Sequence, residues 1–141
     1  MKTYKNFFLL SLLLSSLITF EGFALPSFPG AAGGGAKSQG GRNGVVYEVT
    51  NLNNEGTGSL RNGLEMSGAR TIVFRVSGNI ELTGYIYVAN PYLTIAGQTA
   101  PGDGITISGR KTSDALLIIE THDVIIRYLR IRHGYNATCA P

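Results

Sequence analysis

The apolar residues from position 71 onward recur in short runs rather than at helical spacing. Turns rich in Gly, Asn and Pro separate the runs. Short apolar runs bounded by turn residues are typical of buried β-strands. A similar run lies earlier in the chain. The predicted strands are Val45–Thr50, Thr71–Val76, Asn79–Leu82, Tyr85–Val88, Leu93–Ala96, Ile105–Ser108, Leu116–Ile119, Val124–Arg127 and Leu129–Arg132.

The strands repeat when they are taken in threes. The first series is Ile72, Ile95 and Ile125, the second is Ile80, Ile105 and Ile131, and the third is Ile86 and Leu117. Each series recurs after roughly 22 to 31 residues, a period expected of a solenoid coil. We therefore predict an all-β fold, a three-faced parallel β-helix in which each strand stacks on the strand one coil earlier.

The last predicted strands indicate a corner between two faces. In Leu129–Arg132 apolar residues alternate with arginines, so Arg130 and Arg132 face outward. Arg127 has the same parity as the apolar positions and would be buried in one straight strand. A bend near Tyr128 removes this conflict and ends one strand before the next face begins.

One short helix is predicted between the first two strands. Ser59 can cap a helix that runs to Met66, with Leu60 and Leu64 on one face. Gly63 inside it costs about 1 kcal/mol relative to alanine, so the helix depends on tertiary packing. We expect the two leucines to cover the first coil.

Residues 1–24 have the pattern of a signal peptide. Lys2 and Lys5 form a short basic region, the apolar stretch Phe7 to Phe20 follows, and Gly22-Phe23-Ala24 places small residues at a cleavage site. The apolar stretch is shorter than the roughly 20 residues that span a bilayer. We predict export, cleavage after Ala24 and a secreted chain with no membrane anchor.

Charge and composition exclude several classes of partner. The net charge is +3, and removal of the signal peptide leaves about +2. That is too weak to indicate nucleic acid or membrane binding, but it is compatible with an acidic polysaccharide.

In Gly33–Ser38 the residue before Lys37 is Ala36, which excludes a phosphate-binding loop and nucleotide binding. The single cysteine, Cys139, excludes an internal disulfide framework.

Several motifs, taken together and in this order, resemble the N-terminal part of secreted pectate lyases and related polysaccharide lyases. The most specific are the blocks at residues 94–105 and 124–130. The resembling stretches are Phe28-Pro29-Gly30-Ala31, Gly40-Gly41-Arg42-Asn43-Gly44-Val45-Val46-Tyr47, Val49-Thr50-Asn51-Leu52-Asn53, Gly58-Ser59-Leu60-Arg61, Arg70-Thr71-Ile72-Val73-Phe74, Val76-Ser77-Gly78-Asn79-Ile80, Tyr92-Leu93-Thr94-Ile95-Ala96-Gly97-Gln98-Thr99-Ala100-Pro101-Gly102-Asp103-Gly104-Ile105 and Val124-Ile125-Ile126-Arg127-Tyr128-Leu129-Arg130.

The resemblance implies a right-handed parallel β-helix that binds pectate or polygalacturonate. In that family Ca²⁺ held by aspartates binds the uronate carboxylate, an arginine removes the C5 proton, and the 4-linked sugar leaves by β-elimination. Those residues lie beyond the segment that matches Val124–Arg132. We therefore expect residues 25–141 to be an incomplete N-terminal portion of the domain, with no catalytic residue and no metal ligand of its own. Ca²⁺ is expected for the full-length family, and the full-length protein is expected to be a monomer.

Three groups of polar residues in this chain could bind a ligand or carry a modification. Arg130 and Arg132, facing outward, are candidates to contact a uronate, and Asn136 begins a glycosylation sequon. The histidines, His122 and His133, are interpreted as ordinary surface residues, because nothing in the sequence pairs them with a nucleophile or carboxylate. The acidic residues of the repeating region are interpreted as turn or cap residues. They are Asp103, Asp114, Glu120 and Asp123.

Three classes of function stay open from the sequence. The first is a polysaccharide lyase, of which this chain is an N-terminal piece inactive alone. The second is a non-catalytic secreted β-helix that binds glycans or coats a surface. The third is a truncated product with no independent role.

Overall fold

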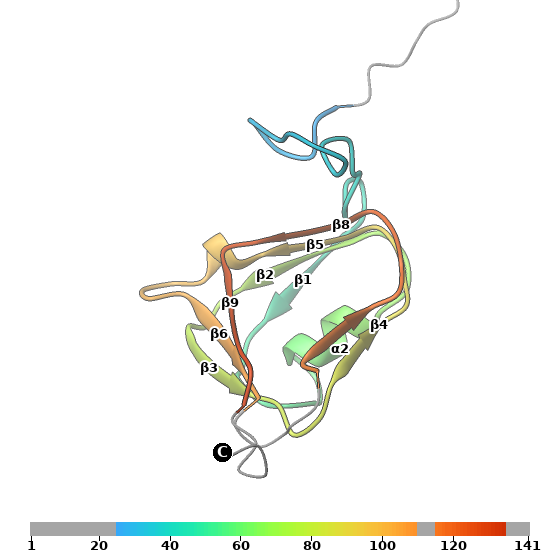
Figure 1. Ribbon diagram of the computed structural model, residues 1–141. Coiled ribbons are helices and arrows are strands. Elements are labelled where there is room, and N and C mark those ends of the chain that lie inside the picture. Colours follow the sequence, from blue (N-terminus) through green and yellow to red (C-terminus); the bar gives the residue numbers. More distant parts are fainter. Residues whose placement is uncertain (1–24, 110–114, 135–141) are drawn as a thin grey trace, which may run out of the picture.

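The computed structural model describes residues 25–109 and 115–134 (Figure 1). The predicted signal peptide lies outside the described residues, as do Asp114, Asn136 and Cys139. The elements are β1 (Val45–Val49), α2 (Leu60–Glu65), β2 (Arg70–Phe74), β3 (Gly78–Glu81), β4 (Ile86–Val88), β5 (Leu93–Ala96), the 3-10 turn η1 (Gly97–Thr99), β6 (Ile105–Ser108), β7 (Leu117–Ile119), β8 (Val124–Arg127) and β9 (Leu129–Arg132).

The strands form three parallel sheets, one for each face of a coil. The first sheet has the order β1-β2-β5-β8, the second β3-β6-β9 and the third β4-β7. All of their pairings are parallel. In Figure 1 the chain circles counter-clockwise while it advances toward the viewer from β1 to β8, so the coil is right-handed. The predicted parallel β-helix is confirmed.

The core consists of aliphatic side chains stacked from coil to coil. Ile72 lies beside Ile95, as predicted, and Ile86 lies beside Leu117. Two predicted members of these stacks are wrong. The residue beside Ile95 is Ile126 rather than Ile125, and the residue between Ile80 and Ile131 is Ile107 rather than Ile105. The corners differ in length between coils, so a fixed sequence period does not give the register.

Ile125 is buried on the outer surface of the first sheet rather than in the core. It pairs with Thr94 and is only 7% exposed. A side chain placed on Gly40 would lie 2.6 Å from its Cδ1 atom, which shows how closely the N-terminal segment covers it. Ile126 faces inward at the end of the sheet and is 38% exposed. At these positions β8 is therefore buried more completely by the N-terminal segment on its outer side than by the core on its inner side.

The N-terminal segment, residues 25–44, crosses the outer surface of the first sheet (Figure 1). Gly41 lies against β2, where an added Cβ would come within 2.0 Å of the Arg70 carbonyl oxygen. Its amide donates to Thr94 Oγ1 on β5 at 2.9 Å. The Gln39 amide donates to Asp123 Oδ1, just before β8, at 2.6 Å. The segment therefore ties three successive coils together.

The helix α2 covers the β1 end of the stack of coils. Ser59 is its N-cap and accepts a hydrogen bond from the Asn62 amide, as the sequence predicts. Leu60 and Leu64 are fully buried and belong to the main hydrophobic core. The predicted covering of the first coil by these leucines is confirmed.

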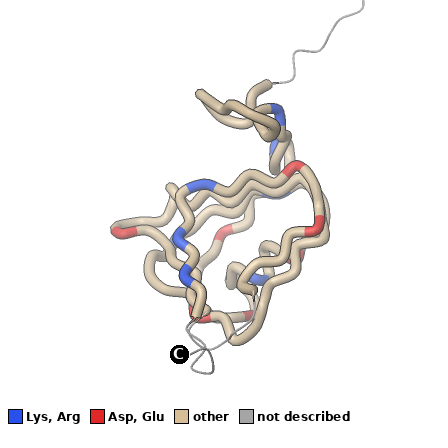
Figure 2. The backbone as a smooth tube through the Cα atoms, in the orientation of Figure 1, with Lys and Arg blue, Asp and Glu red and all other residues tan. Residues whose placement is uncertain are grey.

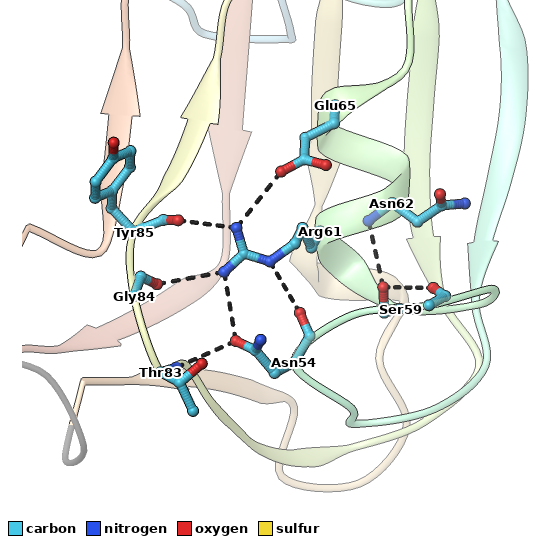
Figure 3. A network of polar contacts seen from close by, with 9 residues as sticks. Asn54, Ser59, Arg61, Asn62, Glu65, Thr83, Gly84 and Tyr85 are labelled. Carbon is cyan, nitrogen blue, oxygen red and sulfur yellow. Dashed lines mark hydrogen bonds and ion pairs between the residues drawn. The ribbon is translucent and has the colours of Figure 1, made fainter.

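Arg61 anchors the exposed side of α2 to two loops (Figure 3). Its guanidinium donates to the Asn54 carbonyl at 3.1 Å, to the Tyr85 carbonyl at 2.8 Å and to the Gly84 carbonyl at 3.3 Å. It also forms an ion pair with Glu65 at 3.4 Å. These contacts fix the helix to the turn that leads into β4.

Within the described ranges, no helix has both the length and the apolar character needed to cross a membrane.

Candidate functional site

The two predicted substrate-binding arginines lie on β9 and face outward. Arg130 is beside Thr106 of β6, Arg132 is beside Ser108, and both arginines are exposed. Figure 2 shows positive positions following one another along the β8–β9 corner. Ile131, between them, is on the inward side but is 50% exposed, because no described strand stacks on β9. Their outward direction is confirmed, while contact with a uronate stays a prediction.

The corner between β8 and β9 is a single residue in a rare backbone conformation. Tyr128 has φ 54°, in the left-handed region that residues other than glycine seldom adopt. The bend predicted near Tyr128 is therefore confirmed. This turn reverses the alternation of inward and outward side chains between β8 and β9. Arg127 therefore faces outward although Leu129, two residues later, faces inward.

Arg127 is held at this corner by two aromatic rings. Its guanidinium carbon lies 4.4 Å from the centre of the Phe28 ring and 5.2 Å from the centre of the Tyr128 ring. Cation–π contacts of this kind are worth about 0.5–1 kcal/mol at exposed sites. Arg127 therefore fastens the N-terminal segment to β8. By contrast, the structure gives Arg130 no ion pair or hydrogen bond with any described residue.

His122 and Asp123 form a pair that the sequence interpretation missed. His122 Nδ1 lies 2.9 Å from Asp123 Oδ2, so the expectation that this histidine has no carboxylate partner is wrong. The hydrogen bond from the Gln39 amide, and secondly that from His122, lowers the pKa of Asp123 below its usual value. Tyr92 packs edge-on against the imidazole, with ring centres 5.3 Å apart. The adjacent His-Asp dipeptide was the available signal.

Asp123 links the N-terminal segment to the start of β8 through Gln39, and we call Gln39, His122 and Asp123 together the latch. Asp123 has φ 55°, and its carbonyl accepts the Leu93 amide at 3.1 Å. Each carboxylate oxygen already has a partner, one in the N-terminal segment and one in His122. The geometry supports the cap role predicted for Asp123.

Two more acidic residues of the repeating region, Asp103 and Glu120, lie within the described residues. Asp103 is exposed in the turn closed by the Gly104 amide and the Pro101 carbonyl, as predicted. Glu120 accepts the Tyr87 hydroxyl at 2.7 Å. In the described part of the chain, no three acidic, histidine or cysteine side chains gather in a way that could hold a metal ion.

Comparison with known proteins finds fungal relatives that share one name, probable pectate lyase C. The chain is 51% identical over 119 residues to the probable pectate lyase C of Aspergillus oryzae, an alignment that covers 84% of this chain and 27% of that protein. The values are 50% over 124 residues for the same-named protein of Aspergillus fumigatus, with 86% and 28% covered. They are 47% over 111 residues for that of Emericella nidulans, with 79% and 25% covered. The resemblance to pectate lyases is confirmed.

The chain spans about a quarter of the length of these pectate lyase relatives. No family profile matches it. The aligned part includes most of the described coils, since the alignments cover 79% to 86% of the chain. The likeness to pectate lyases therefore concerns the β-helix itself.

Proposed function

We propose that this chain supplies the first coils of a secreted polysaccharide lyase that cleaves pectate or polygalacturonate by calcium-dependent β-elimination. The observation that carries the proposal is the identity of about half of the aligned residues with fungal proteins named probable pectate lyase C. The right-handed parallel β-helix, with stacked strands in register over three coils, agrees with it. Because the chain spans about a quarter of those relatives, the activity is proposed for the whole natural protein.

The described residues do not fit the calcium ion that the reaction implies. Calcium takes six to eight oxygen ligands, so a site needs several converging carboxylates or carbonyls. Both Asp123 oxygens and one Glu120 oxygen have partners, and Asp103 lies in a separate turn. We therefore derive no step through calcium from these residues.

The proposed contribution of this chain is to bind and orient the polymer. Arg130 and Arg132 present two cations on the same side of β9, and a guanidinium pairs well with a carboxylate. Residues two apart on one strand are about 6.6–7 Å apart, so the pair can face an extended polyanion.

Activity can be tested on two forms of the protein. The whole natural gene product is expected to release unsaturated uronides from polygalacturonate with Ca²⁺, measured by ultraviolet absorbance, and to stop when the calcium is chelated. Residues 25–141 alone are expected to release none. Chelator-sensitive turnover by residues 25–141 would show that the active site lies within this chain. Pectate binding by the whole product without unsaturated product would favour a non-catalytic glycan-binding β-helix instead.

Secretion is tested separately. The tripartite pattern of residues 1–24 predicts export and cleavage after Ala24, so the exported protein should begin at Leu25. Edman sequencing of protein from the culture medium measures this directly. An extracellular protein that still begins at Met1 would contradict it.

A further inference from the structure

A surface hollow lies at the corner between the first and second sheets. Its volume is about 470 Å³, within the size range of small-molecule sites. The loop after β5 forms one wall, with Gln98, Asp103 and Gly104, and the β8–β9 corner forms the other, with Tyr128 and Arg130. Two consecutive coils therefore build it together.

Two glycines of the loop allow it to lie close to the β8–β9 corner and to Arg130. A Cβ on Gly97 would lie 2.2 Å from the Tyr128 carbonyl oxygen, so only glycine allows the loop to approach the corner so closely. A Cβ on Gly104 would lie 3.2 Å from Arg130 Nη2. A larger side chain at Gly104 would crowd the guanidinium.

The lining residues offer three kinds of contact at one place. Tyr128 is 68% exposed, which is high for a large aromatic residue, and it is held in a strained backbone conformation. Arg130 is a cation without an ion pair among the described residues. Gln98 and Asp103 add an amide and a carboxylate that can hydrogen-bond hydroxyl groups.

This combination matches an acidic sugar. The apolar face of a pyranose ring can pack on an aromatic ring, its hydroxyls hydrogen-bond amides and carboxylates, and a uronate carboxylate pairs with a guanidinium in a forked geometry. A neutral sugar would leave the guanidinium unused, and an apolar ligand would leave three polar groups without partners.

We propose that this corner hollow is a binding subsite for a uronic acid unit, with Arg130 on the carboxylate and Tyr128 against the ring. The proposal rests on the proposed function for its choice of ligand, an acidic polysaccharide. It goes further in naming a place on the β-helix and a residue that selects the acidic form. The hollow accepts de-esterified polymer and rejects the methyl ester, because only the free carboxylate pairs with Arg130.

The test uses protection of Tyr128 in the whole natural gene product. Tyr128 is exposed, so tetranitromethane should nitrate it, and mass spectrometry locates the modified ring. Trigalacturonate should protect Tyr128 from nitration. In Arg130→Gln the half-protecting concentration should rise about tenfold, as expected for loss of one charge-assisted contact. Its thermal midpoint should match that of the unaltered protein, because the Arg130 side chain is exposed.

Lys37→Gln is the matched control. It removes the same charge from another exposed residue that does not line the hollow, so its protection curve should not change. Fully methyl-esterified trigalacturonate should protect Tyr128 at least tenfold less well than the acid. Equal curves for Arg130→Gln and Lys37→Gln, or equal protection by acid and ester, would overturn the subsite. Protection that depends on Arg130 in a protein that forms no unsaturated uronides would support the subsite and refute the lyase.

Discussion

Arg70 is a charged residue inside the core of a small coil. It occupies an inward position of the first sheet, between Val45 and Leu93, and is fully buried. Burial lowers the pKa of Arg70, but a guanidinium stays protonated in proteins. Its guanidinium donates hydrogen bonds to main-chain carbonyls near the end of α2, in the turn before β2 and in the turn before β5. The acceptors are the carbonyls of Gly63, Leu64, Gly68, Asn90 and Pro91.

We expect Arg70→Met in the whole natural protein to lower the free energy of unfolding by about 3 kcal/mol. Methionine fills similar space but leaves the buried carbonyls without donors, and each lost charged hydrogen bond costs about 1.5–3 kcal/mol before relaxation. Urea unfolding followed by circular dichroism measures the change. Arg75→Gln is the control, because Arg75 is exposed and pairs only with exposed Glu48, so its midpoint should hardly move. Equal effects of the two substitutions would contradict the role given to Arg70.

At the scale of elements, α2 depends on a glycine, which weakens an isolated helix by about 1 kcal/mol relative to alanine. Gly63 lies under Tyr47 and Ile72, and an added Cβ would be 2.5 Å from Tyr47 Cδ1 and 2.9 Å from Ile72 Cδ1. Tyr47 in turn accepts hydrogen bonds from the Gly58 amide and the Asn62 side chain, each at 3.0 Å, so its ring cannot move freely. Close packing of the helix on the coil outweighs helix propensity here.

Gly63→Ala is therefore expected to destabilise the protein, although alanine favours helices by about 1 kcal/mol. Overpacking of a fixed core costs about 1–3 kcal/mol, so Tm should fall. Gly84→Ala serves as the comparison, because nothing lies within 4 Å of its added Cβ and its backbone is not left-handed. Calorimetry should show little change or a small rise for Gly84→Ala. A higher Tm for Gly63→Ala would mean that propensity outweighs packing.

The latch between the N-terminal segment and β8 should respond to acid. The Gln39 amide and His122 stabilise the charged form of Asp123, so its pKa in the folded protein is below the usual 3.8. A depressed carboxyl pKa contributes stability above the unfolded value of 3.8, and that contribution is lost as pH falls through the folded pKa. The Gln39 amide shift, followed by NMR, should titrate with a midpoint below 3.8.

Asp123→Asn tests the same latch without the charge. Asparagine tolerates the left-handed backbone at this position and can still accept the Gln39 amide, so the segment should stay in place. The acid-dependent shift of Gln39 should disappear. A Gln39 shift that keeps the same midpoint in Asp123→Asn would assign the titration to another group.

At the scale of the whole molecule, local patterns predicted the coils but not the contacts between distant segments. The runs of apolar residues located every strand to within two residues at each end, and the parity conflict at Arg127 located the corner. The burial of Ile125 was invisible, because an outward position is covered only by a segment that precedes it by about eighty residues. The same holds for the link between Gln39 and Asp123. Register was also missed, since it depends on corner lengths that hydrophobicity does not report.

The open face of the last coil has a consequence for the isolated segment. β7, β8 and β9 each lie at one end of their sheets, and no described strand pairs with their outer edges. The inward residues of that coil are partly exposed, with Ile119 at 39%, Ile126 at 38% and Ile131 at 50%. Unpaired edges beside apolar surface favour addition of strands from other molecules. Purified residues 25–141 should therefore self-associate rather than form a stable monomer.

A lysine on this face should reduce the association. Ile131→Lys places a charge beside the unpaired edge of β9, which disfavours docking of another strand. Leu25→Lys is the control, because Leu25 is 68% exposed in the N-terminal segment and lies on no strand edge. Sedimentation velocity of residues 25–141 should show smaller species for Ile131→Lys than for Leu25→Lys. A sharp thermal transition from a monomeric, unaltered segment would contradict the expectation, since it would mean that three coils and α2 bury enough surface without a further coil. Such a result would also mean that the folded segment tolerates the exposed isoleucines, although each Å² of apolar surface left in water forgoes about 25 cal/mol of stabilisation.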